Sequence, residues 1–412
     1  MRFTAMLAAV VVVVLATPPA AALLTAASAP HRAELARRAA AGAALGHSPR
    51  RVLAEFLADA TLAKARTLRA HAAAGHLGDV LVNTSYGPLV GIGGGNASVN
   101  QFLGVPFAAP PTGSLRWRPP APLAPWGPEP RNATWFAPTC MQEEWYWGVL
   151  TGLSEDCLYA DVYVPASPPP PGGYPVMLFF YGGSWTYGGA SFPLYDGETD
   201  VALMKDVILV AANYRLNVFG FLAGDELLAE SADKSVGNYV SGLQRARARA
   251  PPERRAVRCR CCAAPSACCT KSSTAVPHAS PVPSARTSRP QGFQDQRAVM
   301  KWVRDEIANF GGNPTQVTIF GESAGGGSVS NHLVSPRSRG LFARAAIESG
   351  SFASWTAQPF NISRTRLPQV ARNVQCAGSG PALLACLRAV NETALLAADH
   401  DLTEAFLEWS PV

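Results

Sequence analysis

Three strand-like runs mark the chain: PVMLFF at 175–180, VILVAA at 207–212 and QVTIF at 316–320. The first two lack polar alternation, which is typical of strands buried on both faces of a parallel sheet. Between 295 and 309 apolar residues instead recur at helical spacing, and a second helical stretch follows at 326–334. Alternating strands and helices predict an α/β fold, with helices on both faces of a mostly parallel central sheet.

Upstream of these runs, from about residue 79, the sequence is rich in turn-forming residues. The segment LVNT at 81–84 and the glycine-rich stretch at 91–95 predict an opening hairpin. The chain from Phe102 to Pro130 contains many prolines and is interpreted as irregular surface chain.

The N-terminus has the pattern of a secretory signal peptide. Arg2 precedes an apolar run from Met6 to Ala16, and many small residues follow. The run is shorter than the ~20 apolar residues that cross a bilayer. We therefore expect residues 1–29 to be a cleaved signal, residues 30–78 to be an N-terminal extension, and no membrane span to remain after cleavage.

Five Asn-X-Ser/Thr sequons agree with passage through the secretory pathway. The candidate glycosylation sites are Asn83, Asn96, Asn132, Asn361 and Asn391. We expect a secreted, extracellular protein.

Residues 240–291 differ in composition from the rest of the chain. They hold nine Arg and one Lys against one Glu, and five of the nine Cys, without helical or strand periodicity. Without them the formal net charge changes from +6 to −3, because ten bases and one acid leave. A nucleic-acid-binding or heparin-binding arm and a Cys-rich metal site are alternative interpretations, but the Cys spacing matches no regular zinc pattern.

We favour a third interpretation, a retained intron. Val240-Ser241 can be encoded by GTGAGC and Gln291 by CAG, which resemble a splice donor and acceptor, and the reading frame is kept. Four Cys lie outside the segment and form two short-range disulfide candidates, Cys140–Cys157 and Cys376–Cys386.

The strongest chemical signal is the motif GESAG at 321–325, directly after the strand QVTIF. G-x-S-x-G between a strand and a helix is the nucleophile elbow, whose sharp turn lifts the Ser side chain out of the sheet. Glycines flank it because a Cβ there would clash with neighbouring backbone. A second glycine-rich loop, YGGSW at 181–185, follows the strand PVMLFF, where α/β-hydrolases place part of the oxyanion hole.

With these two sites in place, the chain resembles the type-B carboxylesterase family, the cholinesterase-like branch of the α/β-hydrolases. SEDCLY at 154–159 resembles the family signature SEDCLYLN, FLGVPF at 102–107 resembles its FLGIPYA opening, and VTIFGESAGG at 317–326 follows the family pattern. The match covers about 79–239 and 292–412. Residues 79–412 are thus expected to form one partial α/β-hydrolase domain, incomplete at the C-terminus and interrupted by 240–291.

The resemblance implies Ser323 as the nucleophile, and the backbone N–H groups of Gly183, Ser184 and Ala324 as the oxyanion hole. The family usually has Gly where Ser184 stands. It implies no metal and no organic cofactor.

The resemblance also implies disulfides at both Cys pairs, a structural ion pair between Arg116 and Glu155, and a place for Trp355 near the acyl pocket. Trp145 and Trp147 lie in the loop that carries the choline site in cholinesterases. That loop is much shorter here, so both are interpreted as packing or gorge-lining residues.

Hydrolysis also needs a His and a carboxylate, which in this family lie far downstream, whereas only 89 residues follow Ser323. His332 is expected to be structural, and His400 lies too close to Ser323. The nearby acids have the same problem; they are Asp399, Asp401, Glu404 and Glu408. We therefore expect a truncated family member that has at most trace activity by itself.

The predicted function is hydrolysis of a small-molecule carboxylic ester through a serine acyl-enzyme. The alternative is a catalytically silent, cholinesterase-like secreted binding or adhesion domain, and the intact elbow favours the enzyme. No nucleic-acid partner is expected, since only the basic segment suggests one. The sequence leaves the ester and the oligomeric state open.

Overall fold

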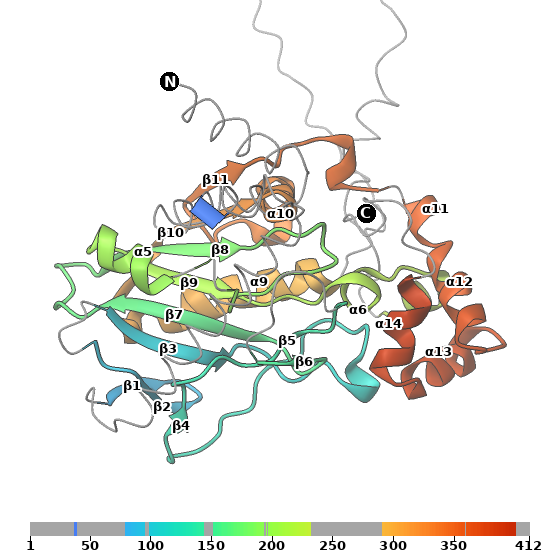
Figure 1. Ribbon diagram of the computed structural model, residues 1–412, viewed down its shortest axis with the longest axis horizontal. Helices are drawn as coiled ribbons and strands as arrows, with labels where there is room; N and C mark the ends of the chain where they lie inside the picture. The colour runs from blue at the N-terminus through green and yellow to red at the C-terminus, as the bar shows by residue number, and fades with distance from the viewer. Residues whose placement is uncertain are drawn as a thin grey trace, which may run out of the picture.

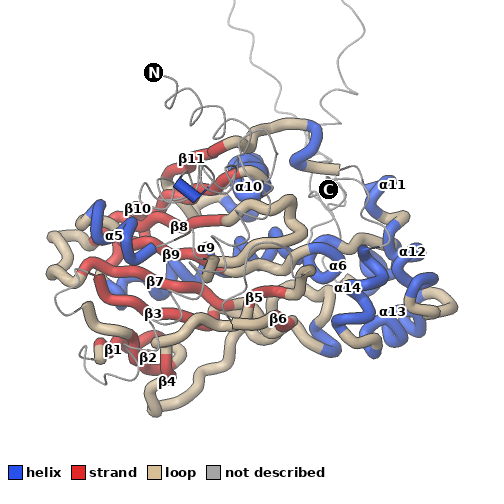
Figure 2. Tube along the Cα trace, viewed as in Figure 1, coloured by secondary structure: helices blue, strands red, loops and turns tan. Residues whose placement is uncertain are grey.

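The computed structural model describes residues 37–38, 79–94, 99–143, 151–192, 195, 197–231, 291–358 and 360–400. The expected signal peptide, almost all of the expected N-terminal extension, and 240–290 lie outside the described residues. Figure 1 shows the arrangement of the described elements, and Figure 2 shows the same view with helices, strands and loops distinguished.

A six-stranded sheet lies at the centre, with strand order β11-β10-β8-β9-β7-β3. Its strands are β3 (Val99–Pro106), β7 (Tyr159–Pro165), β8 (Tyr174–Phe180), β9 (Ile208–Ala212), β10 (Gly312–Glu322) and β11 (Arg344–Glu348). The four strands from β11 to β9 are parallel, while β7 and β3 join antiparallel. The predicted α/β fold with a mostly parallel sheet is confirmed.

The apolar runs occupy the strands expected of them. Every residue of β9 is buried, and β8 buries both of its apolar faces toward its C-terminal end. The predicted helix is α9 (Gln291–Glu306), which begins four residues earlier than expected and continues as a 3-10 turn over Ile307–Phe310. Gly311 ends it with a φ of 81°, a left-handed conformation that favours glycine.

Helices cover the sheet and one end of the fold. Helix α5 (Gly197–Met204) lies in front of the strands in Figure 1 and α9 passes behind them, while α10 (Ala324–Val334) follows β10. Two short helices are α6 (Asn217–Phe221) and α7 (Asp225–Glu230). A C-terminal group lies at the right in Figure 1: α11 (Phe360–Ser363), α12 (Arg366–Asn373), α13 (Gly380–Ala389) and α14 (Glu392–His400).

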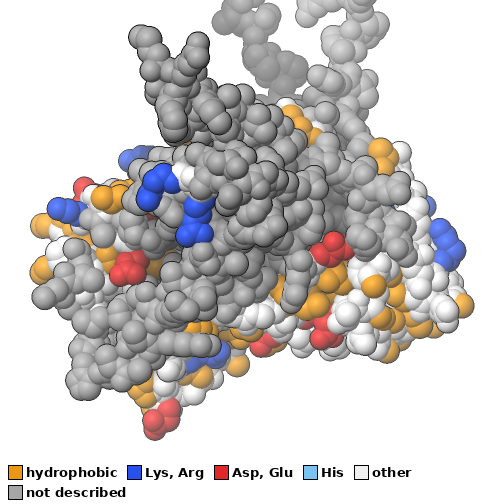
Figure 3. All heavy atoms as spheres, viewed as in Figure 1, with side chains coloured by type: hydrophobic (Ala, Val, Ile, Leu, Met, Phe, Trp, Pro, Cys, Tyr) orange, Lys and Arg blue, Asp and Glu red, His pale blue; other side chains and the backbone are white. Residues whose placement is uncertain are grey.

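Among the described residues no single helix combines the length and hydropathy needed to cross a bilayer. Helices α13 and α14 pass that test only when joined, and they are bent by 108° at the break between them. On the face drawn in Figure 3, charged side chains of described residues lie in small separate groups among hydrophobic and neutral ones.

The interpretation of the whole 102–130 segment as irregular surface chain is wrong for its first part. Residues 102–106 belong to β3, where Phe102, Leu103 and Val105 are buried against β7. Gly104 adopts a φ of 67° where the register of β3 shifts, and its N–H donates to Asp161 Oδ1 at 2.9 Å. Gly and Pro thus mark a β-bulge and a strand end here, not the absence of a strand.

The opening hairpin is present, but its second strand differs from the prediction. Strand β1 (Val80–Thr84) pairs antiparallel with β2 (Gly87–Gly91), so the tight turn lies at Ser85-Tyr86 and not in the glycine-rich stretch. Strand β2 also pairs with β4 (Arg131–Asn132) in a small second sheet. A third, two-stranded sheet joins β5 (Thr139–Cys140) to β6 (Leu153–Ser154).

Arg116 holds the C-terminal helices to the rest of the fold. Its guanidinium pairs with Glu155, and its Nη1 donates to the main-chain carbonyls of Leu387, Arg388 and Val390 at the end of α13. Because a helix C-terminus presents unpaired carbonyls, a buried guanidinium there satisfies them. The ion pair that the resemblance implied is present and is structural.

Candidate active site

Ser323 lies at the junction of β10 and α10, where the chain turns sharply. Its φ of 54° and ψ of −119° are sterically costly for a side chain with a Cβ. Its N–H donates to the carbonyl of Glu348 at 2.9 Å, and its carbonyl accepts from Gly327 N at 2.8 Å. These two hydrogen bonds hold the turn between the neighbouring strand β11 and the first turn of α10.

Glycines are required on both sides of this turn. A Cβ added at Gly321 would lie 2.6 Å from the carbonyl oxygen of Phe180, and one at Gly325 would collide with the same oxygen. The strand β8 therefore approaches the elbow so closely that only hydrogen fits. This is the backbone crowding that the motif predicts.

The loop after β8 lies directly against the elbow. A Cβ added at Gly182 would lie 3.1 Å from Ser323 Cβ. Gly183 and Ser184 have φ values of 111° and 56°. Ser184 thus occupies a left-handed conformation, which explains on steric grounds why glycine suits this position. Ala324, the first residue of α10, is fully buried beside Ser323.

A buried tryptophan anchors this loop to the helix behind the elbow. Trp185 Nε1 donates to Ser328 Oγ of α10 at 3.0 Å, and Gln296 Nε2 of α9 donates to the same oxygen at 3.1 Å. Trp185 is 1% exposed, so these bonds form in a dry environment, where hydrogen bonds are strong. The position of the loop is therefore coupled to two helices.

Trp355 lies on the same side of the elbow. Its ring centroid is 5.8 Å from that of Trp185, and it follows β11 in a 3-10 turn over Ser354–Thr356. Thr356 is buried, and its carbonyl accepts from Asn331 Nδ2 of α10 at 3.0 Å. The structure therefore brings Trp355 next to the loop of Gly183 and Ser184.

His332 does not face Ser323. Its Nδ1 is 2.9 Å from Ser338 Oγ and its Nε2 is 3.1 Å from Gln296 Oε1, while its ring stacks on Phe293 with centroids 3.9 Å apart. Complete burial, and secondarily the charge of Arg297, hold the pKa of His332 well below its usual range. It is a neutral ring that ties α10 to α9.

The other candidate acids, all downstream of Ser323, either make contacts elsewhere or lie outside the described residues. Asp399 is buried at the end of α14 and its Oδ2 accepts from Val218 N of α6 at 3.3 Å. His400 ends α14. Asp401, Glu404 and Glu408 lie outside the described residues, as do Trp145 and Trp147.

A carboxyl group lies beside Ser323. Glu322 is 3% exposed, and burial, followed by the charge of Glu348 on the adjacent strand, raises its pKa to about 8. Its Oε2 would lie 2.9 Å from a Cβ added at Gly182. The acid is therefore largely protonated at neutral pH, directly under the glycine-rich loop.

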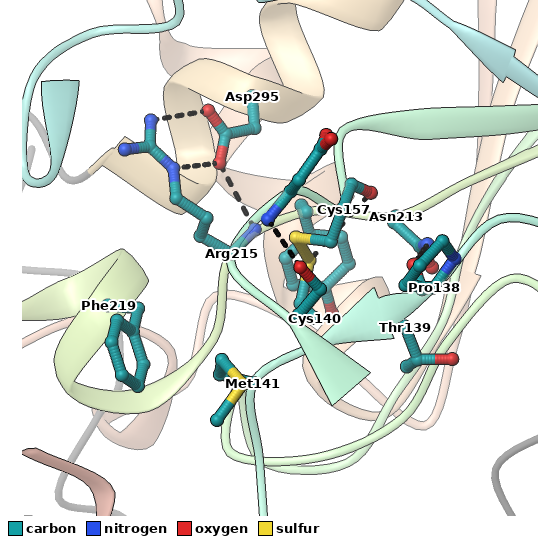
Figure 4. Close-up of a disulfide and its surroundings, with 12 residues drawn as sticks. Pro138, Thr139, Cys140, Met141, Cys157, Asn213, Arg215, Phe219 and Asp295 are labelled. Atoms are coloured by element: carbon teal, nitrogen blue, oxygen red, sulfur yellow. Dashed lines mark hydrogen bonds and ion pairs between the residues drawn. A yellow bond between two sulfur atoms is a disulfide. The ribbon is translucent and has the colours of Figure 1, made fainter. Parts of the chain in front are cut away.

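Both Cys pairs form disulfides, and one lies close to a buried ion pair. Cys140 joins Cys157, and Cys376 joins Cys386. Figure 4 shows the first disulfide next to Arg215, whose guanidinium faces the carboxylate of Asp295 at the start of α9. Both charged side chains are almost fully buried. This pair joins the chain after β9 to the first turn of α9.

Four of the five sequon asparagines are exposed in the structure, namely Asn83, Asn132, Asn361 and Asn391. Asn96 lies outside the described residues. Within the described parts of the chain, no three His, Cys, Asp or Glu side chains gather in a way that could hold a metal ion.

Sequence reasoning missed the environment of Glu322 and the anchor of Trp185. Glu322 stands inside the elbow motif at the buried end of a strand, so the sequence could have predicted that its side chain is buried. Its neighbour Glu348, and the meeting of Trp185, Ser328 and Gln296, follow only from sheet register and helix packing.

Comparison with known proteins agrees with this geometry. The family model described as "Carboxylesterase family" matches residues 78–239 and 286–412. A cholinesterase of Mus musculus is 34% identical over 334 residues, covering 77% of this chain and 45% of the relative. An acetylcholinesterase of Electrophorus electricus is 35% identical over 302 residues, covering 70% of this chain and 38% of the relative.

Among solved structures, a PNB esterase superposes with a TM-score of 0.59 at 29% identity, covering 80% of this chain and 56% of that chain. The fold and the elbow define an α/β-hydrolase, and the chain belongs to the carboxylesterase family. It spans less than half the length of the two curated relatives.

Proposed function

We propose that this chain carries the nucleophile and oxyanion hole of a secreted serine carboxylesterase that acts on small-molecule carboxylic esters. The observation that carries the proposal is the strained turn at Ser323, with the loop of Gly182, Gly183 and Ser184 packed against it. Such a turn costs stability, and it exposes one hydroxyl beside backbone donors. The family membership supports the same reaction.

In the proposed reaction, Ser323 Oγ attacks the ester carbonyl and forms an acyl-enzyme, which water then hydrolyses. The N–H groups of Gly183, Ser184 and Ala324 stabilise the oxyanion, with each donor contributing about 3 kcal/mol in comparable enzymes. Since the pKa of Glu322 is raised to about 8, it is largely neutral at pH 7 and adds little negative charge beside the forming oxyanion.

The proposed reaction also needs a histidine to accept the Ser323 proton. His332 is committed to Ser338 and Gln296 in the structure, so we assign this role to a residue outside those described. We accordingly propose that the described residues by themselves support only trace turnover of p-nitrophenyl esters.

The first test is to sequence the transcript across codons 239–292 and past codon 412, and to express the encoded protein with its Ser323→Ala variant. Ester turnover by that protein, abolished in S323A, is the expected result. Equal turnover by the unmodified protein and by S323A would show that Ser323 is not the nucleophile. No turnover by a product with an intact downstream acid and His would favour the silent binding domain. Robust turnover by the 412-residue chain, lost in S323A, would place the whole triad within it.

We also propose that the protein passes through the secretory pathway and is glycosylated. The two disulfides and the four exposed sequon asparagines support this. Expression in a eukaryotic cell should give a product in the medium whose mass falls after removal of N-linked glycans. A product that remains in the cytosol without glycans would contradict the proposal.

The segment 240–291 is proposed to be a retained intron. The family match stops at 239 and resumes at 286, which supports this. A tryptic peptide that joins Tyr239 directly to Gly292 in the natural protein is the expected observation. Peptides from within 245–289 would contradict it.

A further inference from the structure

A groove separate from the elbow runs along helix α9. It encloses about 610 Å³, and its lining comes from the β1–β2 turn, the segment after β3, α9 and the turn after α10. This volume is in the usual range of small-molecule sites, about 300–1,000 Å³. Neither Ser323 nor the loop of Gly183 and Ser184 belongs to its described lining.

Positive charge predominates in this groove. Arg297 and Lys301 stand four residues apart and therefore share one face of α9, and Arg337 lines the groove from the turn after α10. Asp305 is the one acid among the described lining residues, and its carboxylate pairs with Arg304 at 2.7 Å. Two cations and one acid thus lie on this face of α9, and a bound anion would interact favourably with the cations.

One of these cations is held rigidly inside the protein. Arg297 is 5% exposed, its Nη2 donates to Ser335 Oγ at 3.1 Å, and its guanidinium lies over the ring of Phe293 at 5.4 Å. Lys301 is exposed one turn further along. The groove thus offers one buried and one exposed cation to the same ligand group.

Gln294 and Tyr86 add polar groups to the lining, and the remaining lining residues are apolar. Phe107 and Trp302 are buried along the groove, and the proline-rich segment 119–123 forms its wall. Apolar walls with a few charged groups are typical of sites that bind a ligand with one charged end. We propose that this groove binds an amphiphilic carboxylate, with its head group at Lys301, Arg297 and Arg337 and its hydrocarbon chain along the proline-rich wall.

The proposal goes beyond ester hydrolysis and does not depend on Ser323. The experiment is calorimetric titration of the 412-residue chain with dodecanoate below its micelle concentration. The variants are Lys301→Glu and Arg337→Glu. Lys205→Glu is the matched control, because Lys205 is an exposed lysine outside the groove. Ser323→Ala is titrated in parallel.

We expect saturable binding that weakens at least tenfold in K301E and R337E and is unchanged in K205E and S323A. Circular dichroism is used to check that every variant is folded. If Lys301→Glu does not fold, Lys301→Ala is used in its place. Absence of binding, or equal binding by K301E and R337E, would overturn the proposal. Equal affinity for acetate would reveal a site for the head group alone, and equal affinity for dodecyl maltoside would reveal apolar adsorption; each also overturns it.

Discussion

At the scale of single residues, the candidate site depends on two unfavourable local states held by their surroundings. Ser323 has a left-handed φ, and Glu322 next to it is a buried carboxyl group. Each costs free energy of folding. Both persist because β8, β11 and α10 enclose the turn, so local substitutions there should report on the packing of the site.

The pH dependence of stability should reveal Glu322. Its pKa is raised from 4.5 to about 8 in the folded protein, so the folded state binds a proton that the unfolded state has already lost. Stability should therefore fall as pH rises from about 4.5 to 8, by up to a few kcal/mol. Glu322→Gln should flatten this slope and raise the stability at pH 8.

Denaturant unfolding at several pH values measures this effect. Glu129→Gln, at an exposed loop position, serves as the control and should leave the slope unchanged. An unchanged slope in E322Q would show that Glu322 does not carry the bound proton.

Trp185 should control how firmly the loop of Gly183 and Ser184 is held. Trp185→Phe keeps the apolar ring but removes the donor to Ser328, a loss of about 1 kcal/mol. Amide hydrogen exchange in the peptide 181–189 should become about fivefold faster. Trp126→Phe is the matched control, since Trp126 Nε1 also donates, to the carbonyl of Pro88 at 3.0 Å, but far from the loop. Equal exchange in W185F and the unmodified protein would contradict the anchor.

At the scale of elements, α9 connects several parts of the site. It carries Gln296, which bonds both Ser328 and His332, and Asp295, which pairs with Arg215. Its other face carries Lys301 and lines the groove. Both the site at Ser323 and the groove therefore depend on the correct position of the first turn of α9.

Asp295→Asn should destabilise the fold strongly. It leaves Arg215 as a buried guanidinium that has lost its ion pair, which costs about 3–5 kcal/mol. Asp305→Asn breaks a pair on the same helix whose partners are about half exposed, and should cost less than about 1 kcal/mol. Urea unfolding of the two variants compares them directly, and similar losses would show that the buried pair does not anchor α9.

At the scale of the whole molecule, the described residues on either side of 240–290 form one core. Residues of β9 and of α9 belong to the same hydrophobic cluster, and the Arg215–Asp295 pair joins the two sides. In the sequence, residues 240–290 thus stand between two parts that pack together.

Deletion of 240–291 should accordingly leave the fold intact. We expect a Tm within about 3 °C of the full chain, because no described core residue is removed. Replacement of the segment by a Gly/Ser linker of equal length is the control and should behave alike. Loss of cooperative thermal unfolding in the deletion variant alone would indicate that the segment contributes to the core.

The sequence by itself determined the type and order of the main elements and the place of the elbow. The runs at 175–180 and 207–212, the helical spacing before Gly311 and the glycines at 321 and 325 encode local backbone requirements that any packing must respect. The positions of the Cys residues indicated both disulfides, and the resemblance supported them and added the Arg116–Glu155 pair.

Only the tertiary structure decided which distant residues meet. Strand β3 was not predicted because Gly104 and Pro106 are residues that usually interrupt a strand. In the structure β3 pairs with β7, and Gly104 forms a β-bulge within it. Sheet register likewise places Glu348 beside Glu322. Helix packing brings Trp185 to Ser328, and it brings the proline-rich segment 119–123 to the groove along α9. Those contacts join residues far apart in the chain, and no local pattern specifies them.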